Sequence, residues 1–138
     1  MAQKRKISRG GTRGTVFEAA ARSRHEDAAV LFGKGRYSGA IYLAGYSIEC
    51  LLKRAVTIRH QLVWLPQKLE THNLDLLLAE SGLIEVMKIN KPLFAMYTEV
   101  ADSWSTELRY TAGSSQKRDT ERLYRQMVQI YCWFNEQL

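Results

Sequence analysis

The residue types best suited to chemistry form a stripe in the first half of the chain: Tyr42, Tyr46, Glu49 and Lys53. Their intervals of four, three and four residues place all four on one side of a helix. Tyrosine rings can stack on a nucleobase, and a carboxylate on a buried helix needs a cation because an unpaired buried charge is costly. Lys53 and Arg109 are the natural partners of Glu49. We expect the stripe and Arg109 to bind a ligand; the alternative is that the tyrosines only pack, with their hydroxyls satisfied.

The same stretch carries a second, apolar stripe that must face a core. Its members recur at helical intervals: Ala40, Ala44, Ile48, Leu51 and Ala55. The two stripes together predict a helix from about Ser38 to Arg59. Small residues along it let a neighbouring helix approach closely, and the tyrosines then lie along the contact.

Helical periodicity also marks the segments around this helix. We expect a first helix over 16–33, a short helix over 73–81 that ends at Gly82, and helical structure over 83–104 that is entered or bent at Pro92. His72 lies beside Thr71 and Asn73 at the start of the short helix. Either Thr71 or Asn73 can cap this helix, because a hydroxyl or amide oxygen there satisfies a free backbone N–H, and we interpret His72 as a capping or packing residue.

The last helix is predicted by apolar residues at intervals of four, three and four: Leu123, Met127, Ile130 and Phe134. Residues 111–115 have the composition of a loop, and Ser115 can cap the helix that follows. No segment shows sustained two-residue alternation, so strands are not expected. The sequence therefore predicts an all-α fold, an antiparallel bundle of four to five helices.

Three blocks of the sequence carry a family resemblance. The first is Gly35-Arg36-Tyr37 followed by Ala44-Gly45-Tyr46-Ser47-Ile48-Glu49-Cys50-Leu51-Leu52-Lys53, which closely resembles the second helix of HEPN domains. The other two are Thr71-His72-Asn73-Leu74 and Leu108-Arg109-Tyr110, which resemble the family's later segments in order and spacing. The resemblance spans about residues 17–134 and implies a HEPN-like antiparallel helical bundle.

The resemblance also implies a chemistry and shows where this chain departs from it. Catalytic HEPN proteins are metal-independent endoribonucleases with an arginine and, a few residues later, a histidine at the start of the final helix. Arg109 occupies the arginine position, but positions 113–115 hold glycine and serines, and no histidine follows His72. We therefore expect a binding or regulatory protein with a degenerate catalytic motif.

Two other pairs are candidates for a non-standard ribonuclease site. One is Arg109 with Tyr110, and the other is Arg54 with His60, which has a spacing similar to the family motif. An arginine can neutralise a phosphate and an imidazole can exchange a proton. The structural alternatives are a helix-end contact for the first pair and solvated side chains for the second.

The partners that we expect follow from the same resemblance. Small HEPN proteins often act beside a minimal nucleotidyltransferase in toxin–antitoxin or defence systems, and usually as homodimers. RNA or a nucleotide is the expected ligand. A scaffold subunit of a larger assembly, in which the polar stripe only seals an interface, is the remaining alternative.

Positive charge gathers at the N-terminus. Residues 1–14 contain no acidic residue and five basic ones: Lys4, Arg5, Lys6, Arg9 and Arg13. The rest of the chain has 15 basic and 14 acidic residues. We interpret residues 1–14 as a flexible tail that contacts nucleic-acid phosphates or merely solubilises the chain, and residues 15–138 as the helical domain. On the last helix, Arg118, Arg122 and Arg125 form a basic face that is either solvated or part of an RNA groove.

Composition narrows the class of protein. Apolar residues make up 46% of the chain and charged residues 25%, as in an ordinary globular protein. No apolar run is long enough to cross a bilayer, and no signal peptide is evident, so we expect a cytoplasmic protein with no membrane partner. The three histidines are scattered, so neither a metal site nor a cofactor is expected. Cys50 and Cys132 are expected to be buried, reduced thiols.

Overall fold

The computed structural model describes residues 11–104 and 117–138 of the chain. These residues form six α-helices and one short 3₁₀ helix: α1 (Gly14–Gly33), α2 (Tyr37–Arg59), η2 (Gln67–Leu69), α3 (Leu74–Ser81), α4 (Ile84–Ile89), α5 (Lys91–Ser103) and α6 (Lys117–Gln137). Only an isolated bridge between Arg13 and Trp64 has β geometry within these ranges. The all-α prediction is confirmed. None of the described helices is both long and apolar enough to cross a bilayer.

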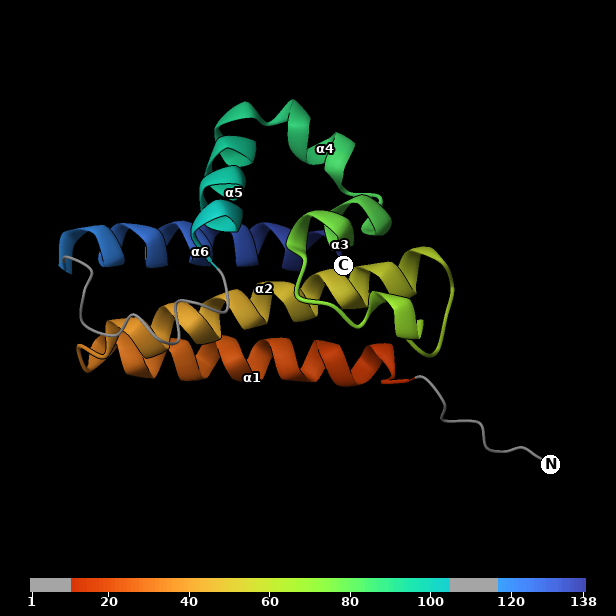
Figure 1. Cartoon of the computed structure of the whole chain (residues 1–138), viewed down its shortest axis with the longest axis horizontal. Helices are drawn as coiled ribbons and strands as arrows, with labels where there is room; N and C mark the ends of the chain where they lie inside the picture. The colour runs from red at the N-terminus through yellow and green to blue at the C-terminus, as the bar shows by residue number, and fades with distance from the viewer. Residues whose placement is uncertain (1–10, 105–116) are drawn as a thin grey trace.

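The helices α1 and α2 form an antiparallel pair that lies along the length of the molecule (Figure 1). A tight turn joins them, with Gly35 at a φ of 77°, a conformation that favours glycine. The apolar stripe of α2 is buried as predicted: Ala40, Ala44, Ile48, Leu51 and Ala55. The bounds of both helices agree with the prediction to within two residues at each end.

The helices α3, α4 and α5 lie on one side of the long pair, where α3 packs on α2 and α5 packs across α6 (Figure 1). Asn73 begins α3 by accepting a hydrogen bond from the backbone N–H of Leu76, and Gly82 ends it at a φ of 79°. The segment 83–104 is two helices and not one, because Asn90 caps α5 and Pro92 occupies its first turn. This division accounts for the six helices observed where four to five were expected.

The direction of α6 differs from the prediction of an antiparallel bundle. Figure 1 shows that α6 lies beside α2 and runs in the same direction, because along both helices the residue number given by the colour bar increases from left to right. The three short helices carry the chain back toward the end at which α2 begins (Figure 1). Three members of the predicted apolar stripe of α6 are buried, namely Met127, Ile130 and Phe134. The fourth, Leu123, is partly buried and packs against the core.

The segment before α1 is tied to the loop after α2. The backbone N–H of Leu65 donates to the carbonyl of Thr12, and that of Gly14 donates to the carbonyl of Val63. The guanidinium of Arg13 lies 4.8 Å from the centre of the Trp64 ring. Residues 12–14, which the sequence assigned to the tail, therefore pack with the helical domain.

Close packing at Gly45 joins the end of α5 to α2. The indole of Trp104, which follows α5 and is 6% exposed, lies where a β-carbon on Gly45 would project. The small residue lets the ring approach the helix backbone, and the two tyrosines of the polar stripe, Tyr42 and Tyr46, pack near it. Gly45 thus has a packing reason within a helix that glycine otherwise weakens.

Substituting Gly45→Ala should destabilise the protein. The new methyl group overlaps the Trp104 indole, and overpacking of this kind costs about 1–3 kcal/mol, more than the ~1 kcal/mol that alanine adds in helix propensity. Gly33→Ala is the matched control, because no atom lies within 4 Å of its added carbon. Urea unfolding followed by circular dichroism measures both. Equal stability of the two variants would contradict the packing described.

Candidate functional site

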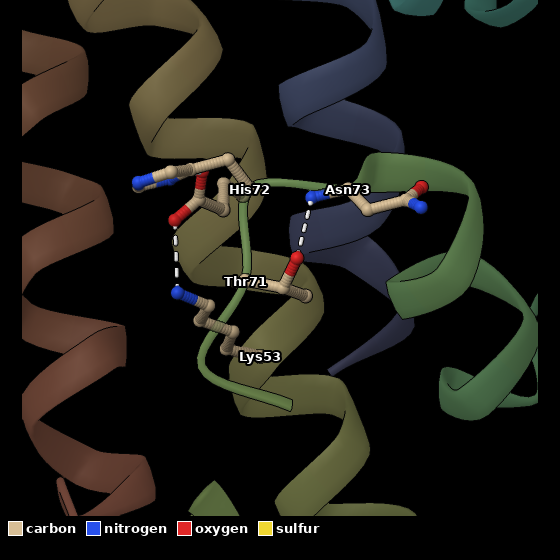
Figure 2. Close-up of polar contacts among 5 residues, drawn as sticks. Lys53, Thr71, His72 and Asn73 are labelled. Atoms are coloured by element: carbon tan, nitrogen blue, oxygen red, sulfur yellow. Dashed lines mark hydrogen bonds and ion pairs between the residues drawn. The ribbon is translucent and has the colours of Figure 1, made fainter. Parts of the chain in front are cut away.

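A buried carboxylate on α2 lies between two nitrogen donors from different parts of the chain. Glu49 is 1% exposed; its Oε2 lies 2.9 Å from Nζ of Lys53 and its Oε1 lies 2.8 Å from Nδ1 of His72. A carboxylate only accepts hydrogen bonds, so Lys53 donates to one oxygen and the Nδ1–H of His72 donates to the other. We call these three residues the Glu49 cluster. Figure 2 shows Lys53 on α2 and His72 on the irregular segment before α3, which crosses that helix.

Lys53 is positioned by the pitch of α2 and by an aromatic ring of α1. It lies one helical turn after Glu49 and is 5% exposed. Its ammonium also lies 5.4 Å from the centre of the Phe17 ring, a cation–π distance. The ammonium of Lys53 and the carboxylate of Glu49 carry opposite charges and stabilise one another inside the protein, where a single unpaired charge would be costly.

The backbone around His72 is fixed by its neighbours. The N–H of Asn73 donates to the hydroxyl of Thr71, a contact drawn in Figure 2, and Asn73 in turn caps α3. Leu69 and Leu74, on either side, are both buried and anchor the segment against the core. The imidazole is thereby held over α2, with 48% of the side chain exposed.

His72 was expected to be a capping or packing residue. The cap is Asn73, as one of the two predicted alternatives had it, whereas the His72 side chain bonds the carboxylate of Glu49. The sequence named Lys53 and Arg109 as partners of Glu49; Lys53 is confirmed, and Arg109 lies outside the described residues. The partner that was missed is 23 positions away. No spacing rule within one helix can find it.

The rest of the polar stripe faces a groove between α1 and α2. The groove has a volume of about 510 Å³ and is lined by residues of both helices: Ala20, Arg24, Asp27, Tyr42, Leu43, Tyr46 and Cys50. The rings of Tyr42 and Tyr46 meet edge to face, with centres 5.6 Å apart. Tyr46 also meets the imidazole of His72 edge to face at 5.8 Å. The groove and the Glu49 cluster are therefore adjacent, with Tyr46 between them.

Two charged side chains of α1 border this groove. The guanidinium of Arg24 donates to Asp27 at 2.9 Å, and both side chains are more than a third exposed. An ion pair at such exposure is worth little and is easily rearranged by a ligand. Sequence analysis did not single out Arg24, because one arginine on a helix carries no signal without the neighbour that faces it.

The predicted ligand-binding residues therefore divide into two groups. Glu49 and Lys53 lie inside and hold each other and His72. Tyr42 and Tyr46 line the groove and are only partly buried. A ligand on this face would meet the tyrosines and His72, while Glu49 would act from behind them.

The cysteines differ in environment. Cys50 is buried at the groove, and burial, aided by the Glu49 carboxylate beside it, raises the pKa of its thiol to about 11. It is therefore a neutral, unreactive thiol near neutral pH. Cys132 was expected to be buried but is exposed on α6, because the apolar stripe of that helix faces the other way. Both thiols are free.

Arg54 and His60 bond to different elements. The guanidinium of Arg54 donates to Glu18 on α1 at 2.7 Å. The Nε2 of His60 lies 3.2 Å from the backbone carbonyl of Glu80 at the end of α3. The Arg54 side chain thus bonds to α1 and the His60 side chain to α3, and the two do not contact a common group.

Other sequence candidates lie partly or wholly outside the described residues. These are Arg109 and Tyr110 and, from the N-terminal tail, Lys4, Arg5, Lys6 and Arg9. On α6, Arg122 pairs with Glu99 and Arg125 lies over the Phe32 ring, so part of the predicted basic face is engaged within the fold; the side chain of Arg118 is not described.

Among the described residues, no group of three or more histidine, cysteine, aspartate or glutamate side chains is placed to hold a metal ion. No protein-family model, no curated protein and no solved structure matches the chain.

A double-mutant cycle should show that Glu49 and Lys53 depend on one another. Glu49→Gln and Lys53→Met each leave one buried charge without its main partner, and we expect each to cost about 3 kcal/mol of unfolding free energy. The double variant removes both charges. It should cost about 2 kcal/mol less than the sum of the single changes.

The control for this cycle is the exposed pair on α1. Arg24→Gln and Asp27→Asn should each change the unfolding free energy by no more than about 0.5 kcal/mol, because solvent screens that pair. Strict additivity of Glu49→Gln and Lys53→Met in urea unfolding would show that the buried pair is not coupled.

Proposed function

We propose that this chain is a HEPN-like helical protein that binds RNA on the face formed by Tyr42, Tyr46 and His72. The observation that carries the proposal is the groove between α1 and α2, with two tyrosines in its wall and the imidazole beside it. Aromatic rings of this kind stack on bases, and stacking tolerates any base sequence. Arg24 adds a cation at the border of the groove for a phosphate.

Two residues of the blocks that carry the resemblance lie on this face, Tyr46 and His72. The first block is the middle of α2, and the second block is Thr71-His72-Asn73-Leu74. These two blocks are separate in sequence, but the bond between Glu49 and His72 brings them together. His72 of the second block therefore lies beside Tyr46 of the first, while the other residues of 44–53 are buried and belong to the core.

We place the protein as a binding or regulatory module beside a nucleotidyltransferase-type partner in a toxin–antitoxin or defence system, and as a homodimer. The support from the surface is an apolar strip at the end of α2, made of exposed side chains: Ile58, Leu62, Val63 and Trp64. Exposed apolar residues that are neighbours in space are typical of protein contacts. The strip lies apart from the groove lining, so a protein and RNA need not compete.

RNA binding is tested by fluorescence anisotropy with labelled tRNA and a labelled single-stranded RNA in EDTA. Tyr46→Leu removes a stacking ring at the groove and should weaken binding about tenfold, within the 1–3 kcal/mol typical of one base–aromatic stack. Tyr37→Leu is the matched control, because Tyr37 lies on α2 outside the groove lining and packs against Phe32. Equal affinities of the two variants would contradict the proposed face.

A deletion separates the contribution of the N-terminal cations. The deletion should end at residue 10, because Thr12 to Gly14 bond to the loop after α2. Loss of the four cations Lys4, Arg5, Lys6 and Arg9 should reduce the slope of log affinity against log salt by up to about 3 for a single strand. An unchanged slope and affinity would remove the tail from the RNA-binding role, and affinity would then rest on the groove alone.

A further inference from the structure

A second hollow lies at the end of α2 and shares no lining residue with the groove between α1 and α2. Its volume is about 370 Å³, which is within the range of ligand pockets. Four apolar residues line it, and the first and last of them are buried: Val56, Leu62, Pro66 and Leu69. Such an apolar hollow at the surface is suited to an apolar side chain of a binding partner.

Exposed apolar side chains continue from this hollow over the loop after α2. Leu62 belongs both to the lining of the hollow and to the apolar strip of Ile58, Leu62, Val63 and Trp64. Val63 is 59% exposed and Trp64 is 40% exposed. We call the hollow and the strip together the α2-end surface. It offers a partner a recess and an apolar rim in one continuous area.

The backbone of the loop is fixed by its own hydrogen bonds. The N–H of Leu62 donates to the carbonyl of Thr57 at 2.8 Å, and Gln61 between them has a φ of 55°. This is the pattern of a Schellman cap at the end of a helix. Backbone bonds to the segment before α1 hold the rest of the loop. A surface that is already ordered loses less conformational entropy when it binds a partner.

Cations outnumber acids around the α2-end surface. Lys68 lines the hollow and the exposed Arg59 ends α2, and neither forms an ion pair with a described residue. Two acids lie nearby in the fold or the chain. Glu80 lines the hollow and lies 3.8 Å from His60, and Glu70 follows η2. The two unpaired cations are therefore available to a partner.

Further cations are attached to the same end of the molecule. Gly11 lies against Trp64 and Leu65, and the guanidinium of Arg13 lies over the Trp64 ring. The residues before Gly11 include four cations and no acid. Figure 1 shows that α1 begins where α2 ends, so these charges all join the chain beside the strip. A partner that covers this end must supply acidic groups to match the positive charge.

The shape of the surface distinguishes between possible occupants. A lipid bilayer offers a broad, flat surface that would leave the hollow unfilled. The phosphates of a nucleic acid match the cations but not the exposed aliphatic side chains. A peptide can supply an apolar side chain for the hollow together with carboxylates for Lys68 and Arg59.

We propose that the α2-end surface binds an acidic, amphipathic segment of a partner protein. An apolar side chain of that segment enters the hollow, and neighbouring aspartates or glutamates pair with Lys68 and Arg59. The inference deepens the partner-binding role in the proposed function and rests on it. The groove between α1 and α2 takes no part, so it stays open to RNA.

The test selects random peptides displayed on phage against the immobilised full-length protein. The enriched peptides should combine aspartate or glutamate with large apolar residues, and one is labelled with fluorescein for anisotropy. Val63→Ser should weaken its binding at least about fivefold, as expected for an apolar contact inside an interface. Val30→Ser is the matched control, because Val30 is 58% exposed on α1 outside the α2-end surface, and it should change the affinity less than about twofold.

A second pair of variants tests the charge of the partner. Lys68→Glu should weaken binding of the peptide about tenfold or more at low salt and less at high salt, because it turns attraction into repulsion. Lys34→Glu makes the same change in net charge at an exposed lysine in the turn between α1 and α2, and should have a much smaller effect. A chain without residues 1–10 should bind more weakly but keep its sensitivity to Val63→Ser.

The outcomes separate this inference from RNA binding. The inference is overturned by a selection without enriched acidic peptides, by equal affinities of Val63→Ser and Val30→Ser, or by peptide binding that depends on residues 1–10 alone. It is also overturned if no peptide binds while vesicles of phosphatidylserine and phosphatidylcholine do, with loss in Val63→Ser, since lipid is then the occupant. Anisotropy with tRNA on the same proteins reports RNA binding: tRNA binding without peptide binding sinks only the docking surface, and the reverse result sinks only the RNA-binding face.

Discussion

The buried carboxylate of Glu49 is the interaction on which the rest of the site depends. A charge that is 1% exposed is tolerated only with partners, and this one has a cation on its own helix and an imidazole from a distant segment. The second bond is the consequential one. It holds the segment before α3 over α2 and so places the His72 side chain beside Tyr46 at the border of the groove.

Two kinds of packing reinforce this constraint. Phe17 of α1 lies near the Lys53 ammonium, and Trp104 after α5 fills the space that Gly45 leaves on α2. The polar stripe is thus closed in by aromatic groups from both sides, and its tyrosines are left at the groove. The tyrosines that line the groove and the buried ion pair therefore belong to one stripe of one helix.

The sequence predicted what lies within one helix and missed what lies between elements. The bounds of α1 and α2, the Asn73 cap and the pairing of Glu49 with Lys53 all follow from local spacing. The bond from His72 to Glu49 and the packing of Trp104 on Gly45 depend on how α3 to α5 fold back, which no periodicity encodes. The prediction of a wholly antiparallel bundle was wrong for the same reason. The prediction that Cys132 is buried was wrong because the apolar stripe of α6 faces the other way. Arg109 and Tyr110 lie outside the described residues and stay predictions.

The most direct test of this account is the tautomer of His72, read from ¹⁵N–¹H correlation spectra of the ¹⁵N-labelled protein above about pH 8, where an ordinary imidazole is neutral. The bond to Glu49 predicts that the hydrogen lies on Nδ1 and that Nε2 is unprotonated, and that Glu49→Gln weakens this preference. His60→Asn assigns the other exposed histidine. A His72 ring with its hydrogen on Nε2 would contradict the claim that the buried carboxylate orients it.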